Sequence, residues 1–215
     1  PEQKALVIAS DIARYGLKTT GEPTQGAGAI AILISKNPRL LVVENGAGID
    51  TSHVMDFWRP TYLTEALVDG KFSTKVYLET LERTWKEYSA ETKRSWDDHA
   101  RFCFHTPFCK MADKAYDRLA RLNAIDITKT TKKLTAESLS YAKMIGNCYT
   151  AALYMSLASL LENDPHNLAN SRIGCYSYGS GAVGEFFSCV VQPEYKNYLF
   201  KSEHKTMLEN RKVLT

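Results

Sequence analysis

A histidine stands just before a helix-start signal in the stretch 102–116, FCFHTPFCKMADKAY. The hydroxyl of Thr106 can accept a backbone N–H at a helix start, and Pro107 fits the first helical position. We therefore predict that His105 is the last residue before a helix. There the helix dipole, with Lys110 one turn on, would favour the neutral imidazole, which can donate a hydrogen bond or exchange a proton near pH 7.

Two other interpretations of this histidine stay open. A histidine at a strand end is often only a hydrogen-bonded part of the structure. A metal site formed by Cys103, His105 and Cys109 is a weak alternative, because no fourth ligand accompanies them.

A glycine-rich turn at 179–184, GSGAVG, matches the dinucleotide-binding pattern GxGxxG. That pattern requires a following helix, whereas the residues after it, EFFSCVV, alternate as a strand does. We therefore predict a strand–turn–strand unit. A plain hairpin turn is the simpler interpretation. The functional one is that glycines let a backbone N–H approach a reacting oxygen, as an oxyanion hole requires.

Other polar residues are equally ambiguous. Asn147 precedes a predicted helix, where asparagine is an expected N-cap. Lys110 and Lys114 either form a solvated helix face or act as a pair of point charges for phosphate groups. Local polarity alone marks three further candidates, which are Asp11, Tyr15 and Asp56.

The elements that must position these residues alternate between strands and helices. We predict buried strands at 4–10 and 29–35 and a third strand at 39–46. We also predict a helix that begins at Ser73 as its N-cap, and its buried face carries Tyr77, Leu81, Thr84 and Tyr88. A short strand at 101–105 leads into a helix with a basic stripe, and two further helices cover 135–144 and 149–161. Strands at 172–179 and 183–191 flank the glycine-rich turn. This order predicts the α/β class.

Composition restricts the partners. The 215 residues are 44% hydrophobic and carry a net charge of +3 without a basic block, so nucleic acid is not favoured. No apolar run approaches the roughly 20 residues that span a membrane. Five cysteines without a CxxC pair indicate neither a disulfide framework nor a zinc knuckle, and a reducing cytoplasm fits them best.

Seven motifs, taken in order, resemble one family, the bacterial-type hydroxymethylglutaryl-CoA synthases of the thiolase fold. They are DIARYG (11–16), EPTQGAGA (22–29), MDFWRP (55–60), VDGK (68–71), HTPFCKM (105–111), GNCYTAALYMSLASLL (146–161) and SYGSGAVGEFFS (177–188). The resemblance implies a layered α/β/α/β/α fold that is incomplete here. Residues 1–50 would end the first thiolase-like half, and 51–215 would form the second half, which holds the substrate.

The resemblance also implies an activity. It is a transferase that adds the acetyl group of acetyl-CoA to the ketone of acetoacetyl-CoA, then hydrolyses the enzyme thioester to release hydroxymethylglutaryl-CoA, in the mevalonate pathway of isoprenoid biosynthesis. The implied enzyme is a cytoplasmic homodimer that uses CoA thioesters as substrates, with no metal and no separate cofactor.

Residue roles follow from the same resemblance. His105 would hold acetoacetyl-CoA and protonate the alkoxide that forms at its ketone carbon, and Asn147 would bind the same substrate near its thioester. Ser180 would complete the oxyanion hole through the backbone N–H of its loop. The resemblance also implies three groups of substrate-binding residues. Gly179 and Gly181 flank that serine. Asp11, Tyr15 and Asp56 support acetyl transfer or orientation, and Lys110 and Lys114 contact CoA phosphates.

One departure from the family pattern concerns the nucleophile. In this family a cysteine and a general-base glutamate precede the DIARYG-like strand, and none of the five cysteines here matches that cysteine. We therefore expect an internal fragment that exposes a large apolar face and is inactive alone. Two alternatives are a carrier-protein-dependent synthase of polyketide branching and a non-catalytic acyl-CoA-binding or dimerisation module.

Overall fold

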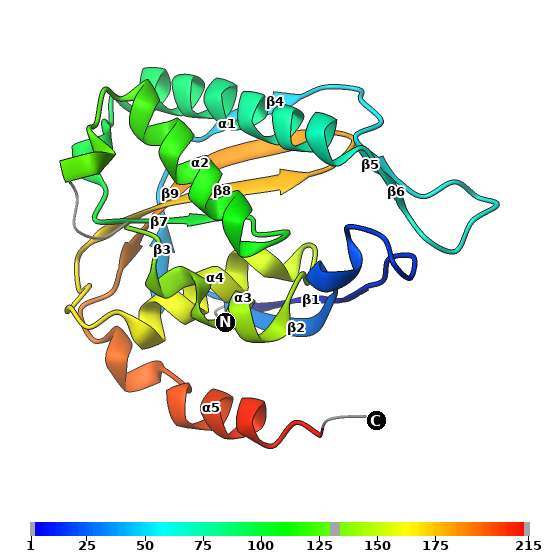
Figure 1. Ribbon diagram of the computed structural model, residues 1–215. Coiled ribbons are helices and arrows are strands. Elements are labelled where there is room, and N and C mark those ends of the chain that lie inside the picture. Colours follow the sequence, from blue (N-terminus) through cyan, green and yellow to red (C-terminus); the bar gives the residue numbers. More distant parts are fainter. Residues whose placement is uncertain (1–2, 130–133, 213–215) are drawn as a thin grey trace.

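One five-stranded sheet lies between two groups of helices (Figure 1). The computed structural model describes residues 3–129 and 134–212, so the first two and the last three residues of the chain lie outside it. The predicted α/β class is confirmed.

The central sheet has the order β3-β9-β8-β7, with β4 also paired to β9. Its strands are β3 (Leu41–Val43), β4 (Gly48–Thr51), β7 (Arg101–Phe104), β8 (Arg172–Gly179) and β9 (Val183–Val191). The glycine-rich turn joins β8 and β9 as an antiparallel hairpin, as predicted, and β7 runs parallel to β8. Because β3 and β4 pair with β9, the sheet crosses the predicted division at residue 50.

Two long helices cover one face of this sheet, namely α1 (Gly70–Thr92) and α2 (Cys109–Leu122) (Figure 1). The predicted face of α1 is buried, including Tyr77, Leu81 and Tyr88. The predicted N-cap, Ser73, is wrong. Asp69 caps the helix, because its Oδ1 accepts the N–H groups of Lys71 and Phe72.

The other face is covered by α3 (Ser140–Ile145) and α4 (Ala151–Asn163). Alternation along β7 separates the two sides, as predicted for a strand. Phe102 and Phe104 belong to the core beneath α1 and α2, whereas Cys103 packs with Leu153 and Leu157 of α4.

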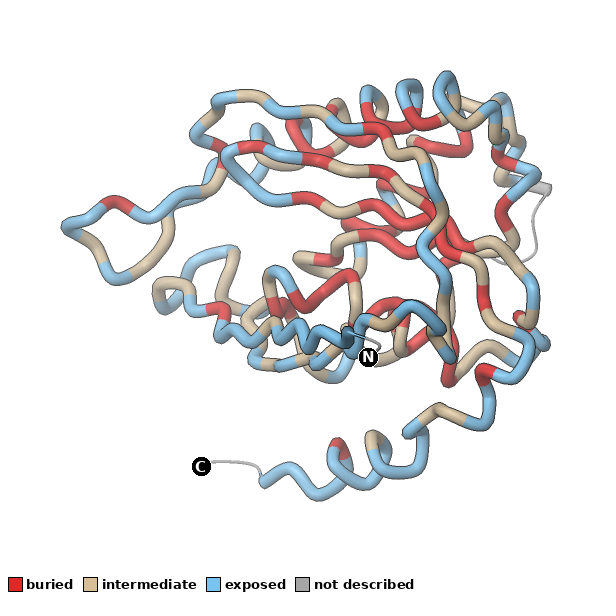
Figure 2. The backbone as a smooth tube through the Cα atoms, turned by 180° about the vertical axis from the view of Figure 1, so that it is seen from behind, coloured by how far each residue is buried: buried red, intermediate tan, exposed pale blue. Residues whose placement is uncertain are grey.

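The remaining elements are short or peripheral. They are β5 (Phe57–Trp58), β6 (Leu67–Val68), α5 (Lys201–Glu209) and 3-10 turns at Glu22–Thr24, Trp96–Asp98, Ile127–Lys129, Glu137–Leu139 and Tyr195–Tyr198. The β5–β6 hairpin projects from the rest of the fold in both views (Figures 1 and 2). Within 3–129 and 134–212, no helix has the length and apolar character needed to cross a bilayer.

A separate two-stranded sheet, β1 (Ala5–Ala13) with β2 (Gly26–Ile34), packs against α3 and α4. The prediction that its strands are buried is wrong for both: β1 is exposed along almost its whole length (Figure 2), and β2 alternates between half-buried and exposed residues with none buried. Leu6 and Ile8, for example, are 61% and 64% exposed. Apolar residues on both faces of a strand are typical of a sheet that other elements cover on both sides. The exposed apolar face that the sequence leads us to expect therefore lies on this hairpin.

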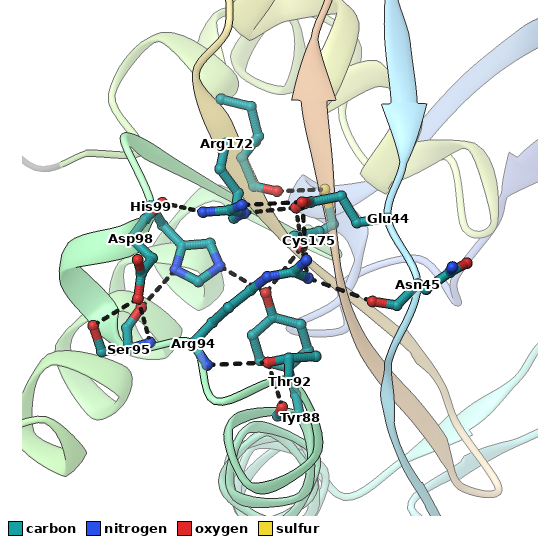
Figure 3. Close-up of polar contacts among 12 residues, drawn as sticks. Glu44, Asn45, Tyr88, Thr92, Arg94, Ser95, Asp98, His99, Arg172 and Cys175 are labelled. Atoms are coloured by element: carbon teal, nitrogen blue, oxygen red, sulfur yellow. Dashed lines mark hydrogen bonds and ion pairs between the residues drawn. The ribbon is translucent and has the colours of Figure 1, made fainter.

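A charged network joins the sheet to the C-terminal end of α1 (Figure 3). Glu44 accepts two hydrogen bonds from the guanidinium of Arg172, at 2.6 and 3.0 Å, and one from Arg94 at 2.9 Å. The hydroxyl of Ser188 also donates to Glu44, at 2.8 Å. Chiefly through the Arg172 hydrogen bond, these groups hold the pKa of the Glu44 carboxyl below its ordinary value.

His99 extends this network into the core. Its side chain is 4% exposed, with Nδ1 at 2.8 Å from the Ser95 carbonyl and Nε2 at 3.0 Å from the hydroxyl of Tyr88. Burial is the main reason that the pKa of His99 falls from 6.5 to about 4. Its imidazole is therefore neutral in the folded chain at pH 7.

We expect the chain to lose stability between pH 6.5 and 4 through His99. The unfolded histidine binds a proton near pH 6.5, whereas the folded one resists protonation until about pH 4. Between these two pH values protons therefore bind preferentially to the unfolded state. This lowers the free energy of unfolding by about 3 kcal/mol at pH 4. Urea unfolding at pH 7.5, 5.5 and 4.5 measures this loss, which should be smaller in His99→Gln. The exposed His53, as His53→Gln, is the control; equal pH slopes for wild type and His99→Gln would contradict the assignment.

Candidate active site

Three of the predicted site segments meet at one edge of the central sheet. β7 and β8 are parallel, so their C-terminal ends lie together, and β4 ends beside the start of β9. His105 follows β7, the turn at 180–182 follows β8, and Asp56 lies a few residues beyond β4. The sheet topology thus brings together residues that lie far apart in the sequence.

The segment that carries His105 is held through its backbone. The His105 N–H donates to the carbonyl of Tyr176 at 2.7 Å, and the His105 carbonyl accepts the hydroxyl of Tyr77 at 2.8 Å. The imidazole lies beside the ring of Tyr178, with 6.4 Å between the ring centroids.

The prediction that His105 directly precedes a helix is wrong. The helix α2 begins at Cys109 with Phe108 as its N-cap residue. The hydroxyl of Thr106 donates backwards to the carbonyl of Phe104, at 2.7 Å, and so does not cap the helix. The Thr-Pro pair therefore shapes the turn that ends β7.

The imidazole of His105 is nevertheless neutral at pH 7. Although the residue keeps partial solvent exposure, the protein atoms around the ring lower its pKa from 6.5 to about 4. The cause is burial, not the helix dipole. A neutral ring offers one N–H donor and one acceptor nitrogen.

Asp56 organises the glycine-rich turn. Its carboxylate is 0% exposed and accepts the hydroxyls of Tyr178 at 2.8 Å and Ser73 at 3.1 Å. Its Oδ1 accepts the backbone N–H of Gly181 at 3.0 Å. Burial, followed by the hydrogen bond from the Tyr178 hydroxyl to Asp56, raises the pKa of Tyr178, so its hydroxyl stays protonated.

These bonds decide which amide of the turn can face a ligand. The Gly181 N–H is taken by Asp56, and the Ala182 N–H donates to the carbonyl of Ser52. Gly181 is therefore not the oxyanion donor that its glycine character suggests. The amide of Ser180 makes no hydrogen bond to another described residue and is the donor that remains for a bound oxygen.

A second cluster forms around Asn147, which is 3% exposed. Its Nδ2 donates to the hydroxyl of Tyr15 at 2.9 Å, and its Oδ1 accepts the N–H of Tyr149. The prediction that Asn147 caps the next helix is wrong, since Thr150 occupies that position. The side chain instead ties the loop to Tyr15, in the segment that follows β1.

Glycines allow the loop before β2 to reach this cluster. The N–H of Asn147 donates to the carbonyl of Thr24 at 3.0 Å. Gly146 has φ +86°, and a Cβ there would lie 2.1 Å from the Gln25 carbonyl oxygen. A larger residue at 146 would therefore separate the two segments.

Asp11 lies near the same cluster. It accepts the N–H of Ile12, and its charge adds to the burial that raises the pKa values of Cys148 and Tyr149. Tyr149 also hydrogen-bonds Tyr15. The predicted residues Asp11, Tyr15 and Asn147 are thus neighbours.

Phe57 joins the two clusters. It follows Asp56, and its ring lies 6.0 Å from that of Tyr15 and 6.1 Å from that of Tyr149, between centroids. Beside it is an open hollow of about 420 Å³, with Arg14 and Arg59 on its walls. The arrangement places apolar rings and cationic groups next to hydrogen-bonding side chains, as sites for extended anionic ligands require.

Lys110 and Lys114 lie on the exposed face of α2, which starts close to His105. Lys114 sits over the ring of Phe108, with its Nζ 5.9 Å from the centroid. The predicted stripe is shorter than expected, because its third member, Arg118, pairs with Glu82 on α1.

Metal binding at Cys103, His105 and Cys109 does not fit the geometry. Cys103 packs in the core under α4, whereas Cys109 packs against the core under α1 and α2. Among residues 3–129 and 134–212, no set of three His, Cys, Asp or Glu side chains is arranged to hold a metal ion.

Sequence reasoning did not assign several residues of the site. Tyr178 and Phe57 lie inside the motifs SYGSG and MDFWRP. Their proximity to candidate site residues can therefore be seen in the sequence. Ser73 was given a helix-cap role, and Tyr77 was placed only on a buried face. The signal that links these side chains to Asp56 and His105 is tertiary.

A family model described as "Hydroxymethylglutaryl-coenzyme A synthase C terminal" matches residues 42–127 and 121–215. The hydroxymethylglutaryl-CoA synthase of Enterococcus faecalis is 41% identical over 100% of this chain and 56% of its own length. The polyketide biosynthesis 3-hydroxy-3-methylglutaryl-ACP synthase of Bacillus subtilis is 34% identical over 90% of this chain and 50% of its own length. The chain thus spans about half the length of these curated relatives.

Solved structures give the same result. The chain matches an HMG-CoA synthase complexed with CoA with a TM-score of 0.90 and 41% identity, covering 98% of this chain and 54% of that one. It matches MvaS in complex with 3-hydroxy-3-methylglutaryl coenzyme A with a TM-score of 0.89 and 39% identity, over 99% and 58% of the two chains. The thiolase-like α/β fold is therefore confirmed over the matched half.

Proposed function

The chain belongs to the hydroxymethylglutaryl-CoA synthase family, and we propose that it is the substrate-holding part of an enzyme that condenses acetyl-CoA with acetoacetyl-CoA. The product would be 3-hydroxy-3-methylglutaryl-CoA for the mevalonate pathway. We extend the proposal to a cytoplasmic homodimer, with the two thiolase-like halves contributing to one site. Solved relatives bound to CoA and to 3-hydroxy-3-methylglutaryl coenzyme A support CoA-thioester binding.

The observation that carries this proposal is the meeting of His105 with the Asp56-held turn at one sheet edge. A neutral His105 would donate its N–H to the ketone oxygen of acetoacetyl-CoA and supply a proton as the alkoxide forms. The free amide of Ser180 would stabilise the oxyanion of the acetyl thioester.

Asn147 would hold the same substrate near its thioester carbonyl. Its amide has two donor hydrogens, and the bond to Tyr15 uses one of them. Asp11 and Tyr15 would orient this amide, and Gly179 would leave room for the substrate at the turn. In this role Asp56 acts indirectly, because its carboxylate is buried and already accepts three hydrogen bonds from protein donors.

We expect the chain to bind CoA thioesters with a contribution from two lysines. Isothermal titration calorimetry with CoA and acetoacetyl-CoA should show affinity for both. The double variant Lys110→Gln/Lys114→Gln should bind CoA about tenfold more weakly, about 1.4 kcal/mol, because two charges that face phosphate are lost. The difference should shrink at high salt.

The matched control lies on α5. Lys201 and Lys205 have the same spacing on an exposed helix, so Lys201→Gln/Lys205→Gln should leave the affinity unchanged. Equal affinities in all three proteins would remove the lysines from the site. Absence of any CoA-thioester binding by the wild type would contradict the function itself.

A carrier-protein-dependent synthase is the second candidate. The relative from Bacillus subtilis is an ACP synthase, and the curacin-pathway HMG synthase, solved with a holo donor-ACP, matches with a TM-score of 0.88 and 31% identity. The higher identity to the Enterococcus faecalis enzyme favours the CoA substrate. Tighter binding of acetoacetyl-carrier protein than of acetoacetyl-CoA would reverse this order.

A further inference from the structure

Three hydrogen bonds form a closed ring around the segment that carries His105. The hydroxyl of Tyr77, on α1, donates to the His105 carbonyl at 2.8 Å. The His105 N–H donates to the carbonyl of Tyr176, on β8, at 2.7 Å. The hydroxyl of Tyr176 closes the ring by donating to the backbone carbonyl of Tyr77 at 3.0 Å.

The ring is rigid because its two tyrosines are buried and in contact. Tyr77 is 1% exposed and Tyr176 is 0% exposed. Their aromatic rings meet edge to face, with centroids 5.2 Å apart, and the ring of Tyr178 lies 5.0 Å from that of Tyr77. Burial raises the pKa values of Tyr77 and Tyr176, so both hydroxyls remain donors.

The segment needs this support because it lies between β7 and α2, which end at Phe104 and begin at Cys109. The His105 N–H forms the last bond of the β7–β8 ladder, whereas its carbonyl lies beyond the end of β7 and before the start of α2. The Tyr77 hydroxyl joins this backbone to the middle of the sheet-covering helix. Without the hydroxyl, a partly buried carbonyl would lose its donor, and the segment would have to move to reach another donor.

We infer that Tyr77 is a positioning residue, which fixes the imidazole of His105 against Tyr178 at the edge of the sheet. It acts through the His105 carbonyl and does not touch the substrate. That the imidazole then meets acetoacetyl-CoA rests on the proposed function. The positioning itself does not.

The test is the variant Tyr77→Phe in the full chain, with the His105 ring followed by NMR and assigned through His105→Gln. The groups that face this imidazole are the phenol of Tyr178 and, beyond it, Asp56; burial alone accounts for its low pKa. We expect that pKa, about 4 in the wild type, to rise by at least about one unit in Tyr77→Phe. The affinity for acetoacetyl-CoA should fall at least about threefold.

Tyr195→Phe is the matched control. Tyr195 is also 1% exposed, and its hydroxyl accepts the N–H of Leu168 in a different core cluster. It should lower stability comparably and leave the pKa of His105 and the affinity unchanged. An unchanged pKa in Tyr77→Phe would overturn the inference and leave Tyr77 a structural residue.

Two outcomes separate this inference from the proposed function. The NMR titration needs no substrate, so a chain that binds no CoA thioester still tests the positioning. If Tyr77→Phe does not fold, an NMR measurement on the wild type tests the positioning instead. A slowly exchanging Tyr77 hydroxyl proton with a cross-peak to the His105 backbone is expected, and its absence would overturn the inference.

Discussion

Incubating the 215-residue chain with labelled acetyl-CoA is expected to leave no stable acetyl group on the protein. Thioester formation requires a thiolate in reach of the substrate. Burial raises the pKa values of Cys103, Cys109 and Cys148. A hydrogen bond with Cys189, followed by burial, raises the pKa of Cys175, and Cys189 itself is buried in the core. The raised pKa values keep these four thiols protonated at pH 7, and a protonated thiol is a poor nucleophile toward a thioester.

The expected loss of acetyl transfer is large, because the groups of a covalent mechanism act together and the loss of one removes most of the rate. Once the nucleophile is absent, positioning and oxyanion donors retain only a small part of the rate. The measurement is protein-bound label after denaturation, with and without acetoacetyl-CoA. Cys109→Ser is the control, since Cys109 alone of the five cysteines is not buried and could be acetylated nonspecifically. Label that survives in Cys109→Ser and is discharged by acetoacetyl-CoA would sink the prediction.

The variant Asp56→Ala is expected to lower the free energy of unfolding by about 3–5 kcal/mol. It leaves three donors without their acceptor, namely the hydroxyls of Tyr178 and Ser73 and the N–H of Gly181. Each unsatisfied buried donor costs about 1–3 kcal/mol, and Ser73 can turn toward water. The turn should loosen at the same time, because its Gly181 anchor is lost.

Asp69→Ala provides the comparison. Asp69 also accepts two backbone N–H groups, but it is an exposed helix cap whose loss costs about 1 kcal/mol. Urea unfolding measures both variants, and amide hydrogen exchange measures the turn. A destabilisation no larger than that of Asp69→Ala, with unchanged exchange at Gly181, would show that Asp56 does not organise the turn.

The sequence determined the elements and their exposed or buried faces wherever the pattern was periodic. The buried face of α1 and the strand–turn–strand unit of β8 and β9 are confirmed, and side chains alternate along β7, because side-chain spacing directly reflects the helix and strand repeats. The burial of β1 was predicted wrongly. An apolar strand indicates that it can pack against other elements, but it does not indicate whether residues of this chain cover it.

Helix starts show the same limit at shorter range. Ser73, Thr106 and Asn147 are all typical capping residues, yet none of them is the N-cap, and Ser73 and Asn147 bind side chains far away in the sequence. A hydroxyl or amide binds whichever partner the fold brings nearest, and for Ser73 that partner is Asp56, which is 17 positions away. Local sequence cannot identify such a partner.

The candidate site divides in the same way. The sequence by itself determined the residue types at stake, from His105 and Asn147 to the turn around Ser180, and motif resemblance determined the family. Only the tertiary structure decided that Asp56 takes the Gly181 amide, that burial sets the state of His105, and that Tyr77 holds its backbone. The reason is physical: hydrogen-bond partners and desolvation depend on distances between elements, and the parallel pairing of β7 with β8 sets those distances.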